Sequence, residues 1–226
     1  MTEWRNMLRH KLNMYKLARK KSNVCSLFLP FMIGIVLGIT AKLIDVSYVT
    51  SKFPVFDNIM GRFGIWVWAA AIISILSKTA LFAAVRSFLF FVGMLLAYYG
   101  YTVLFLKFFP KSQIILWSGI AMITPFCGFL IWQIHRKRRY TNFISSLPLV
   151  IFFTEWYLTA YTSFGIAKDE LLLSIAYFCF TFSFLAVIPT NKKRLFSLLY
   201  GILESIILIL FIRKGIIVNP YDLLNI

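Results

Sequence analysis

Charge, histidine and cysteine are all scarce in this chain of 226 residues. Charged residues make up 14% of it, while 60% of the residues are hydrophobic. A soluble domain of this length needs many more polar residues to cover its surface. The scarcity of charge therefore excludes an ordinary soluble fold and predicts a membrane protein.

The few histidines and cysteines limit the chemistry as well. His10 and His135 lie beside basic stretches. Cys25, Cys127 and Cys179 lie in apolar runs, where a thiol packs like a small hydrophobic side chain. We therefore expect no metal site, no cofactor and no disulfide framework. Walker A and GxSxG motifs are also missing, so ATP hydrolysis and serine-hydrolase chemistry have no support.

What the chain does have is a large excess of basic residues, with 24 Lys and Arg against 8 Asp and Glu. These residues mark the ends of apolar segments, as in membrane proteins, and do not form the stripe of a nucleic-acid binder. We therefore expect no nucleic-acid partner. Residues 1–23 form a basic N-terminal segment. It is predicted to be a topogenic anchor, or alternatively an amphipathic helix on anionic lipid at the cytoplasmic face.

Seven apolar runs are long enough, or nearly so, to cross a bilayer as helices. They predict an all-α, polytopic transmembrane helical bundle of about seven spans, followed by a short tail over 213–226. The break at 77–79 is either a tight helical hairpin or part of a re-entrant segment. The predicted spans are 24–44, 61–77, 80–106, 113–134, 143–164, 171–189 and 195–212.

The loop charges predict the orientation. With a cytoplasmic N-terminus, the basic clusters at 136–139 and 192–194 and the single Lys78 all fall on the cytoplasmic side. Most of the acids fall on the other side, as the positive-inside rule requires. Six or eight spans would break this alternation. We therefore expect a multi-pass protein of the cell (inner) membrane with its C-terminus outside.

Two acids lie inside predicted spans, where an ionised carboxylate is costly. Glu155 shares a helical face with Thr159 and Thr162, and Glu204 shares one with Tyr200. These residues are candidates for binding a substrate, a cation or a proton in a common cavity. Alternatively, each glutamate bonds a hydroxyl or an arginine and holds helices together.

Arg86 is the candidate counter-ion, because it lies about six residues inside the third span. Its long side chain is predicted to extend to the cytoplasmic interface. The alternative is an ion pair with Glu204, whose expected depth is similar.

A second polar group surrounds the first outer loop and comprises Asp45, Asp57, Asn58 and Arg62. Helix capping is the favoured role, since Asp and Asn commonly begin helices. An entrance for a solute or ion is the alternative.

Gly34 and Gly38 form a small-xxx-small pair in the first span. This spacing permits close helix packing, either within the chain or with a partner. Pro125 and Pro148 lie within predicted spans, where proline can kink a helix and free a carbonyl.

Three stretches of the first three spans carry a family resemblance: GIVLGITAKLID, FDNIMGRFGIWVWAAAIIS and AAVRSFLFFVGMLLAYYGY. Their glycine-rich helix, Asn-Gly-Trp region and Tyr-Tyr pair resemble small multi-pass membrane proteins of bacteria grouped as a domain of unknown function. The resemblance covers about a third of the chain. That family has no established activity, so the resemblance implies no catalytic residues and leaves both glutamates undecided.

The leading functional hypothesis is a small permease, or the membrane subunit of a transporter, with an acidic cavity among spans three, five and seven. The alternative is an accessory, assembly or sensory subunit that docks a protein partner or a second copy of itself. A membrane-embedded enzyme using Glu155 and Glu204 as an acid and base ranks third, so we do not expect an enzyme.

Overall fold

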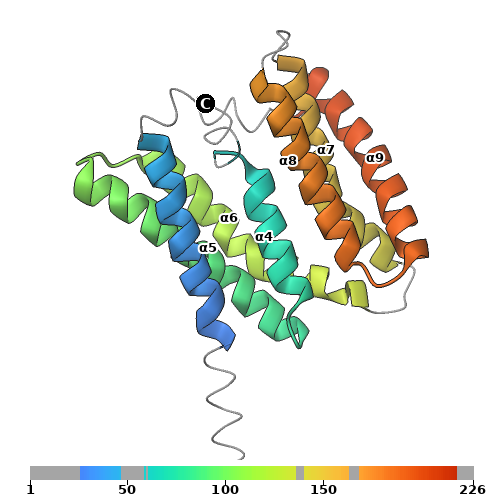
Figure 1. Ribbon diagram of the computed structural model, residues 1–226, viewed down its shortest axis with the longest axis horizontal. Coiled ribbons are helices and arrows are strands. Elements are labelled where there is room, and N and C mark those ends of the chain that lie inside the picture. The colour runs from blue at the N-terminus through green and yellow to red at the C-terminus, as the bar shows by residue number, and fades with distance from the viewer. Residues whose placement is uncertain (1–25, 47–58, 60, 136–139, 163–167, 218–226) are drawn as a thin grey trace, which may run out of the picture.

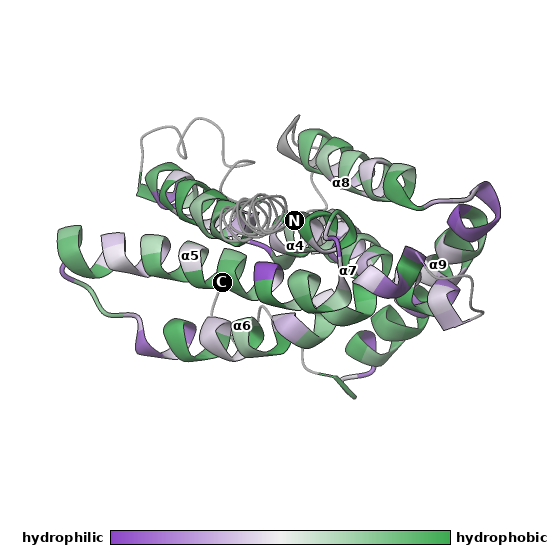
Figure 2. Cartoon of the chain, turned by 90° about the horizontal axis from the view of Figure 1, so that it is seen from below, coloured by the Kyte–Doolittle hydropathy of each residue, from purple (hydrophilic) through white to green (hydrophobic). Residues whose placement is uncertain are grey.

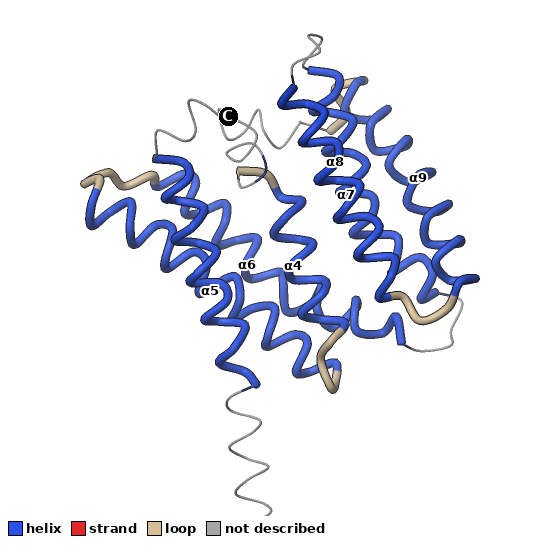
Figure 3. The backbone as a smooth tube through the Cα atoms, viewed as in Figure 1, coloured by secondary structure: helices blue, strands red, loops and turns tan. Residues whose placement is uncertain are grey.

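The chain folds into helices that lie where the apolar runs predict them (Figures 1 and 3). The structure is a computed structural model and describes residues 26–46, 59, 61–135, 140–162 and 168–217. Within these residues there is no β-strand, and seven α-helices have 13 or more residues. They are Ser26–Val46, α4 (Phe63–Ile75), α5 (Ala80–Phe105), α6 (Lys111–Trp132), α7 (Tyr140–Thr162), α8 (Lys168–Val187) and α9 (Asn191–Arg213), and the short 3₁₀ helix η1 (Gln133–His135) follows α6.

Four helical segments are long and apolar enough to cross a membrane: Ser26–Val46, Ala80–Phe105, Lys111–His135 and Asn191–Arg213. The stretches Phe63–Ile75 and Leu171–Val187 are apolar but shorter. Many large hydrophobic side chains face outward, and hydrophilic residues gather mainly at helix ends (Figure 2). Such an apolar surface suits lipid rather than water. The all-helical, membrane-type fold is thus confirmed, while the number of crossings stays a prediction.

The short helix α4 lies at the centre and packs against α5, α6, α7 and α8. Its residues belong to two hydrophobic clusters. Trp66 packs with Phe90 of α5 in one cluster, and Ile75 packs with Phe152 of α7 in the other. Trp68 contacts both clusters. Helix α4 therefore joins the first half of the bundle to the second.

Glycines set the crossing between helix Ser26–Val46 and α5. A Cβ atom added to Gly34 would lie 2.1 Å from the Phe90 carbonyl oxygen, and one added to Gly38 would lie 2.6 Å from that of Met94. From the other side, a Cβ on Gly93 would lie 2.3 Å from the Phe31 carbonyl oxygen. The small-xxx-small pair therefore lies at a close contact within the chain.

Residues 77–79 lie in a tight hairpin between α4 and α5. The Thr79 side chain caps α5 by accepting from the Phe82 amide. From α6 and its 3₁₀ extension, Trp132 Nε1 donates to the Ser77 carbonyl over 2.9 Å, and His135 Nε2 lies 2.8 Å from the Ile75 carbonyl. These contacts hold the hairpin against the end of α6.

Both prolines lie inside helices that continue through them. Because Pro125 has no amide hydrogen, the Ala121 carbonyl loses its usual helical donor. The Thr124 hydroxyl donates to that carbonyl over 2.7 Å, and Ser87 of α5 donates to the Thr124 carbonyl over 3.1 Å. The carbonyl that Pro125 leaves without a helical donor therefore accepts from a hydroxyl group instead.

Candidate functional site

Glu155 is the most buried carboxylate that the described chain offers, with 4% of its surface exposed. One oxygen, Oε1, accepts from the Phe63 amide over 2.9 Å. The other, Oε2, accepts from the Gly64 amide over 2.7 Å and from the Tyr177 hydroxyl over 2.8 Å. The site therefore joins α7, the first residues of α4, and α8.

This geometry makes Glu155 the N-terminal cap of α4. The residue at the N-cap position, Arg62, makes no capping hydrogen bond with its own side chain. The first amides of a helix otherwise lack partners and carry the positive end of the helix dipole. The carboxylate of Glu155, 92 and 91 residues later in the chain, accepts from both amides and places negative charge at the positive end of the helix.

Gly64 is required for this approach. A Cβ atom at Gly64 would lie 2.5 Å from Glu155 Oε2 and 2.7 Å from the Tyr177 ring. Real Cβ atoms do not come this close to other heavy atoms. Neither Gly64 nor Tyr177 is among the site residues predicted from the sequence. In the sequence, the only hint of this contact is a glycine at the start of an apolar run.

Glu204 lies in a different place, on the seam between α7 and α9. Its Oε2 accepts from the Ser146 hydroxyl over 2.8 Å. About two turns earlier on α9, the Ser197 hydroxyl bonds that of Ser145 on α7, and a Cβ on Gly201 would lie 2.8 Å from that of Leu149. Small residues and hydroxyl pairs of this kind are typical of closely packed membrane helices.

Arg86 joins neither glutamate. Its Nη1 donates to the Ser77 hydroxyl over 3.1 Å, and its Nε has no hydrogen-bond partner in the described part of the chain. Within the described ranges, Arg86 and Glu204 form no ion pair. The structure thus places Arg86 on the 77–79 hairpin, at the end predicted to be cytoplasmic.

The remaining predicted site residues do not complete a common acidic cavity. Tyr200 is largely exposed on α9. Thr159 and Thr162 lie in the last turns of α7, and their side chains are outside the described residues. Where the structure describes the chain, no three His, Cys, Asp or Glu side chains gather closely enough to hold a metal ion.

The polar group at the outer loop also differs from the one expected. Asp57 and Asn58 are outside the described residues. Asp45 Oδ2 lies 2.5 Å from Lys42 Nζ and accepts from the Tyr98 hydroxyl over 3.0 Å. The Lys42 ammonium also lies 4.7 Å from the centre of the Tyr98 ring. The sequence signal for this ion pair is a lysine and an aspartate three residues apart on one helix.

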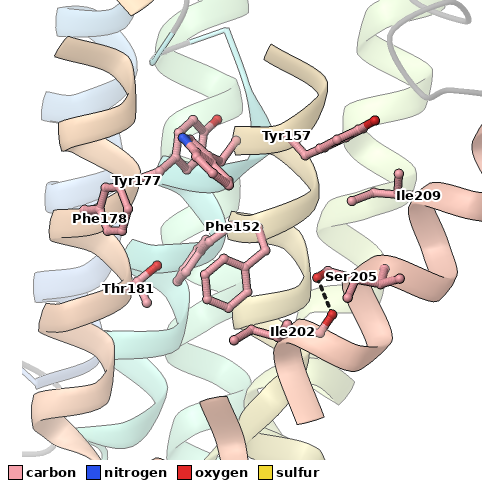
Figure 4. Close-up of a pocket in the computed structure, with 11 residues that line it drawn as sticks. Phe152, Tyr157, Tyr177, Phe178, Thr181, Ile202, Ser205 and Ile209 are labelled. Carbon is pink, nitrogen blue, oxygen red and sulfur yellow. Dashed lines mark hydrogen bonds between the residues drawn. The ribbon is translucent and has the colours of Figure 1, made fainter. Parts of the chain in front are cut away.

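A pocket of about 330 Å³ lies among α7, α8 and α9 (Figure 4). Its walls are almost entirely apolar. Neither Glu155 nor Glu204 lines it, but Tyr177 does, and Tyr177 bonds Glu155. Tyr177 therefore touches the pocket and bonds the buried carboxylate with its hydroxyl.

No protein-family model matches this chain, and neither curated proteins nor solved structures give a match. The family resemblance of the first three spans therefore stays a prediction. The functional argument rests on the site itself.

Proposed function

We propose that the chain is a small membrane transport protein, or the membrane subunit of one, in which Glu155 exchanges a proton. The observation that carries this proposal is the beginning of α4 against a buried carboxylate inside the bundle. In several transporter folds, discontinuous helices place their N-termini at the binding site. Here the carboxylate that faces such a terminus belongs to the chain itself.

The lengths of the helices support a start of α4 inside the bundle. Trp66, in the first turn of α4, packs against Phe90 of α5. Beyond Phe90, α5 continues to Phe105, about 22 Å at 1.5 Å per residue. Helix α4 has 13 residues, or about 20 Å, against about 30 Å for a hydrocarbon core. Helix α4 is therefore about two thirds as long as a span.

The hydrogen bonds indicate how a proton is accommodated. Three donors point at the carboxylate of Glu155. A protonated carboxyl must itself donate one bond, and backbone amides cannot accept it. Among these three donors, the Tyr177 hydroxyl can change from donor to acceptor. This hydroxyl is therefore the group that rearranges when Glu155 gains or loses a proton.

The test is a proton-flux assay with the full-length protein in liposomes that contain a trapped pH-sensitive dye, under an imposed membrane potential. We expect the wild type to conduct protons faster than protein-free liposomes. Glu155→Gln and Tyr177→Phe should lose most of the excess flux, because each removes one partner of the bond that rearranges when Glu155 exchanges its proton. The matched control Glu204→Gln should keep it, since Glu204 bonds Ser146 on the seam between α7 and α9 and does not bond Tyr177. Wild-type flux equal to that of empty liposomes would refute the proposal.

A second function is favoured by one observation, namely that each glutamate is bonded by the chain's own donors. Such groups fit a non-transporting accessory or assembly subunit, in which they hold helices together. Affinity purification from native membranes distinguishes the two. A partner recovered in constant stoichiometry, together with no proton flux, would favour the accessory function.

We also infer that all seven helices belong to membrane crossings, with a cytoplasmic N-terminus, in the cell membrane. Support comes from the loop charges and from the four long apolar helices. In a variant without native cysteines, Lys111→Cys should react with an impermeant maleimide on intact cells. Lys78→Cys should react only after permeabilisation. Reaction of both from the same side would refute this topology.

A further inference from the structure

The pocket forms where α8 and α9 both pack against α7. Both α8 and α9 pack on α7, whereas α8 and α9 are not among the closely packed helix pairs. In Figure 4, Phe178 of α8 and Ile202 of α9 lie on opposite sides, and Phe152 of α7 lies between them. The space between α8 and α9 is thus a groove with α7 as its floor.

The walls favour hydrocarbon and not another helix. Helices pack closely in membranes through Gly, Ala, Ser and Thr, which let backbones approach. Here the walls are mainly aromatic and isoleucine side chains, and the two small polar wall residues, Thr181 and Ser205, are buried. Phe178 and Ile206, by contrast, line the pocket and are about half exposed. A thin, flexible chain fits such a groove better than a helix does.

Positive charge lies at one end of the groove. The Arg213 guanidinium carbon lies 5.3 Å from the centre of the ring of Tyr157, a wall residue, and exposed Lys214 follows it. Along α9, Arg213 is about 17 Å from Ile202 at the far end of the pocket. One leaflet of hydrocarbon is about 15 Å deep, half of a core of about 30 Å. A lipid with its phosphate at Arg213 therefore places an acyl chain along the whole pocket.

We propose that the groove between α8 and α9 binds one acyl chain of an anionic phospholipid, with the headgroup phosphate at Arg213 and Lys214. The volume of about 330 Å³ lies in the range of small-molecule pockets. Basic side chains at the membrane surface attract anionic headgroups. This site does not depend on proton transfer at Glu155, so either proposal can fail without the other.

The test is photo-crosslinking of the full-length protein in liposomes. They contain a trace of phosphatidylglycerol with a photoreactive group in its acyl chain, or phosphatidylcholine with the same chain. We expect crosslinks on the wall residues of α8 and α9. Ile206→Trp fills the groove and should abolish them. Ile207→Trp is the matched control, because Ile207 is about equally exposed but does not line the pocket. Thr181→Phe is a second filling variant at another wall.

The headgroup is tested at the two ends of α9. Lys214→Gln should lower crosslinking by phosphatidylglycerol about fivefold, which corresponds to about 1 kcal/mol for one basic residue at an anionic surface. Lys192→Gln, at the opposite end of the helix, should change it little. Equal crosslinking of Ile206→Trp and Ile207→Trp would overturn the proposal, as would crosslinks spread evenly over α9. Occupation of the groove by a second polypeptide would overturn it too.

Discussion

Replacing Gly34 by alanine tests whether the first helix and α5 are held together by backbone contact. The added methyl group would lie 2.1 Å from the Phe90 carbonyl oxygen and 3.0 Å from the Met94 amide nitrogen. Both are backbone atoms, so no side-chain rotation relieves the clash. To reach ordinary contact at 3.4 Å, the helices must separate by roughly 1.3 Å at this point.

The expected magnitude follows from two opposing effects. Overpacking a well-packed contact costs about 1 to 3 kcal/mol, while alanine gains up to about 1 kcal/mol over glycine in a helix. Because the added methyl group meets backbone atoms, we expect an overpacking cost of about 2 to 3 kcal/mol. After the gain from alanine, the free energy of unfolding should fall by about 1 to 2 kcal/mol. For a chain of this size that lowers the melting temperature by about 2 to 8 °C.

The assay is thermal unfolding of the purified protein in detergent, followed by tryptophan fluorescence. Gly100→Ala in α5 and Gly119→Ala in α6 are matched controls, because an added Cβ meets nothing within 4 Å at either position. Their melting temperatures should stay the same or rise by up to about 4 °C. The reasoning fails if Gly34→Ala melts at or above the wild-type temperature.

Three further predictions concern stability in the same assay. Glu155→Gln should lower the free energy of unfolding by about 2 to 4 kcal/mol, because three donors lose a charged acceptor. Glu204→Gln should lower it by at most about 1 kcal/mol, and equal losses would contradict the capping role of Glu155. Asp45→Asn should lower the free energy of unfolding by about 2 to 3 kcal/mol, because it leaves the ammonium of Lys42 without its partner and Lys42 is only 8% exposed. The double variant Asp45→Asn, Lys42→Met should recover most of that loss. Thr154→Val should stabilise by about 1 kcal/mol, because the Thr154 hydroxyl is buried without a hydrogen-bond partner in the described chain; a lower melting temperature would contradict this.

The helices and their apolar character follow from the sequence by itself. The predicted span 80–106 and α5 (Ala80–Phe105) differ by one residue. The predicted span 61–77 is longer than α4 (Phe63–Ile75), because the turn at its end uses the residues after Ile75. The length of an apolar run is a local property, so no tertiary information is needed to locate it.

The partners of the polar residues were decided only by the tertiary structure. The sequence identified Glu155 as an expensive group in a span but gave no sign that it caps α4. That role needs three helices to meet, and it needs Gly64 to leave room for the carboxylate. Glu204 has an equally apolar sequence context, yet it bonds one serine on a helix seam.

The position of Glu155 in an apolar helix and the partners of its carboxylate therefore have different physical causes. Apolar run length and charge scarcity predict from the sequence alone that Glu155 lies within an apolar helix, because each residue's transfer to hydrocarbon depends on its own chemistry. Whether that acid meets a helix N-terminus, a hydroxyl or lipid depends on how helices cross. Helix crossing is fixed by glycine contacts such as Gly34 against α5, and these involve residues far apart in the chain.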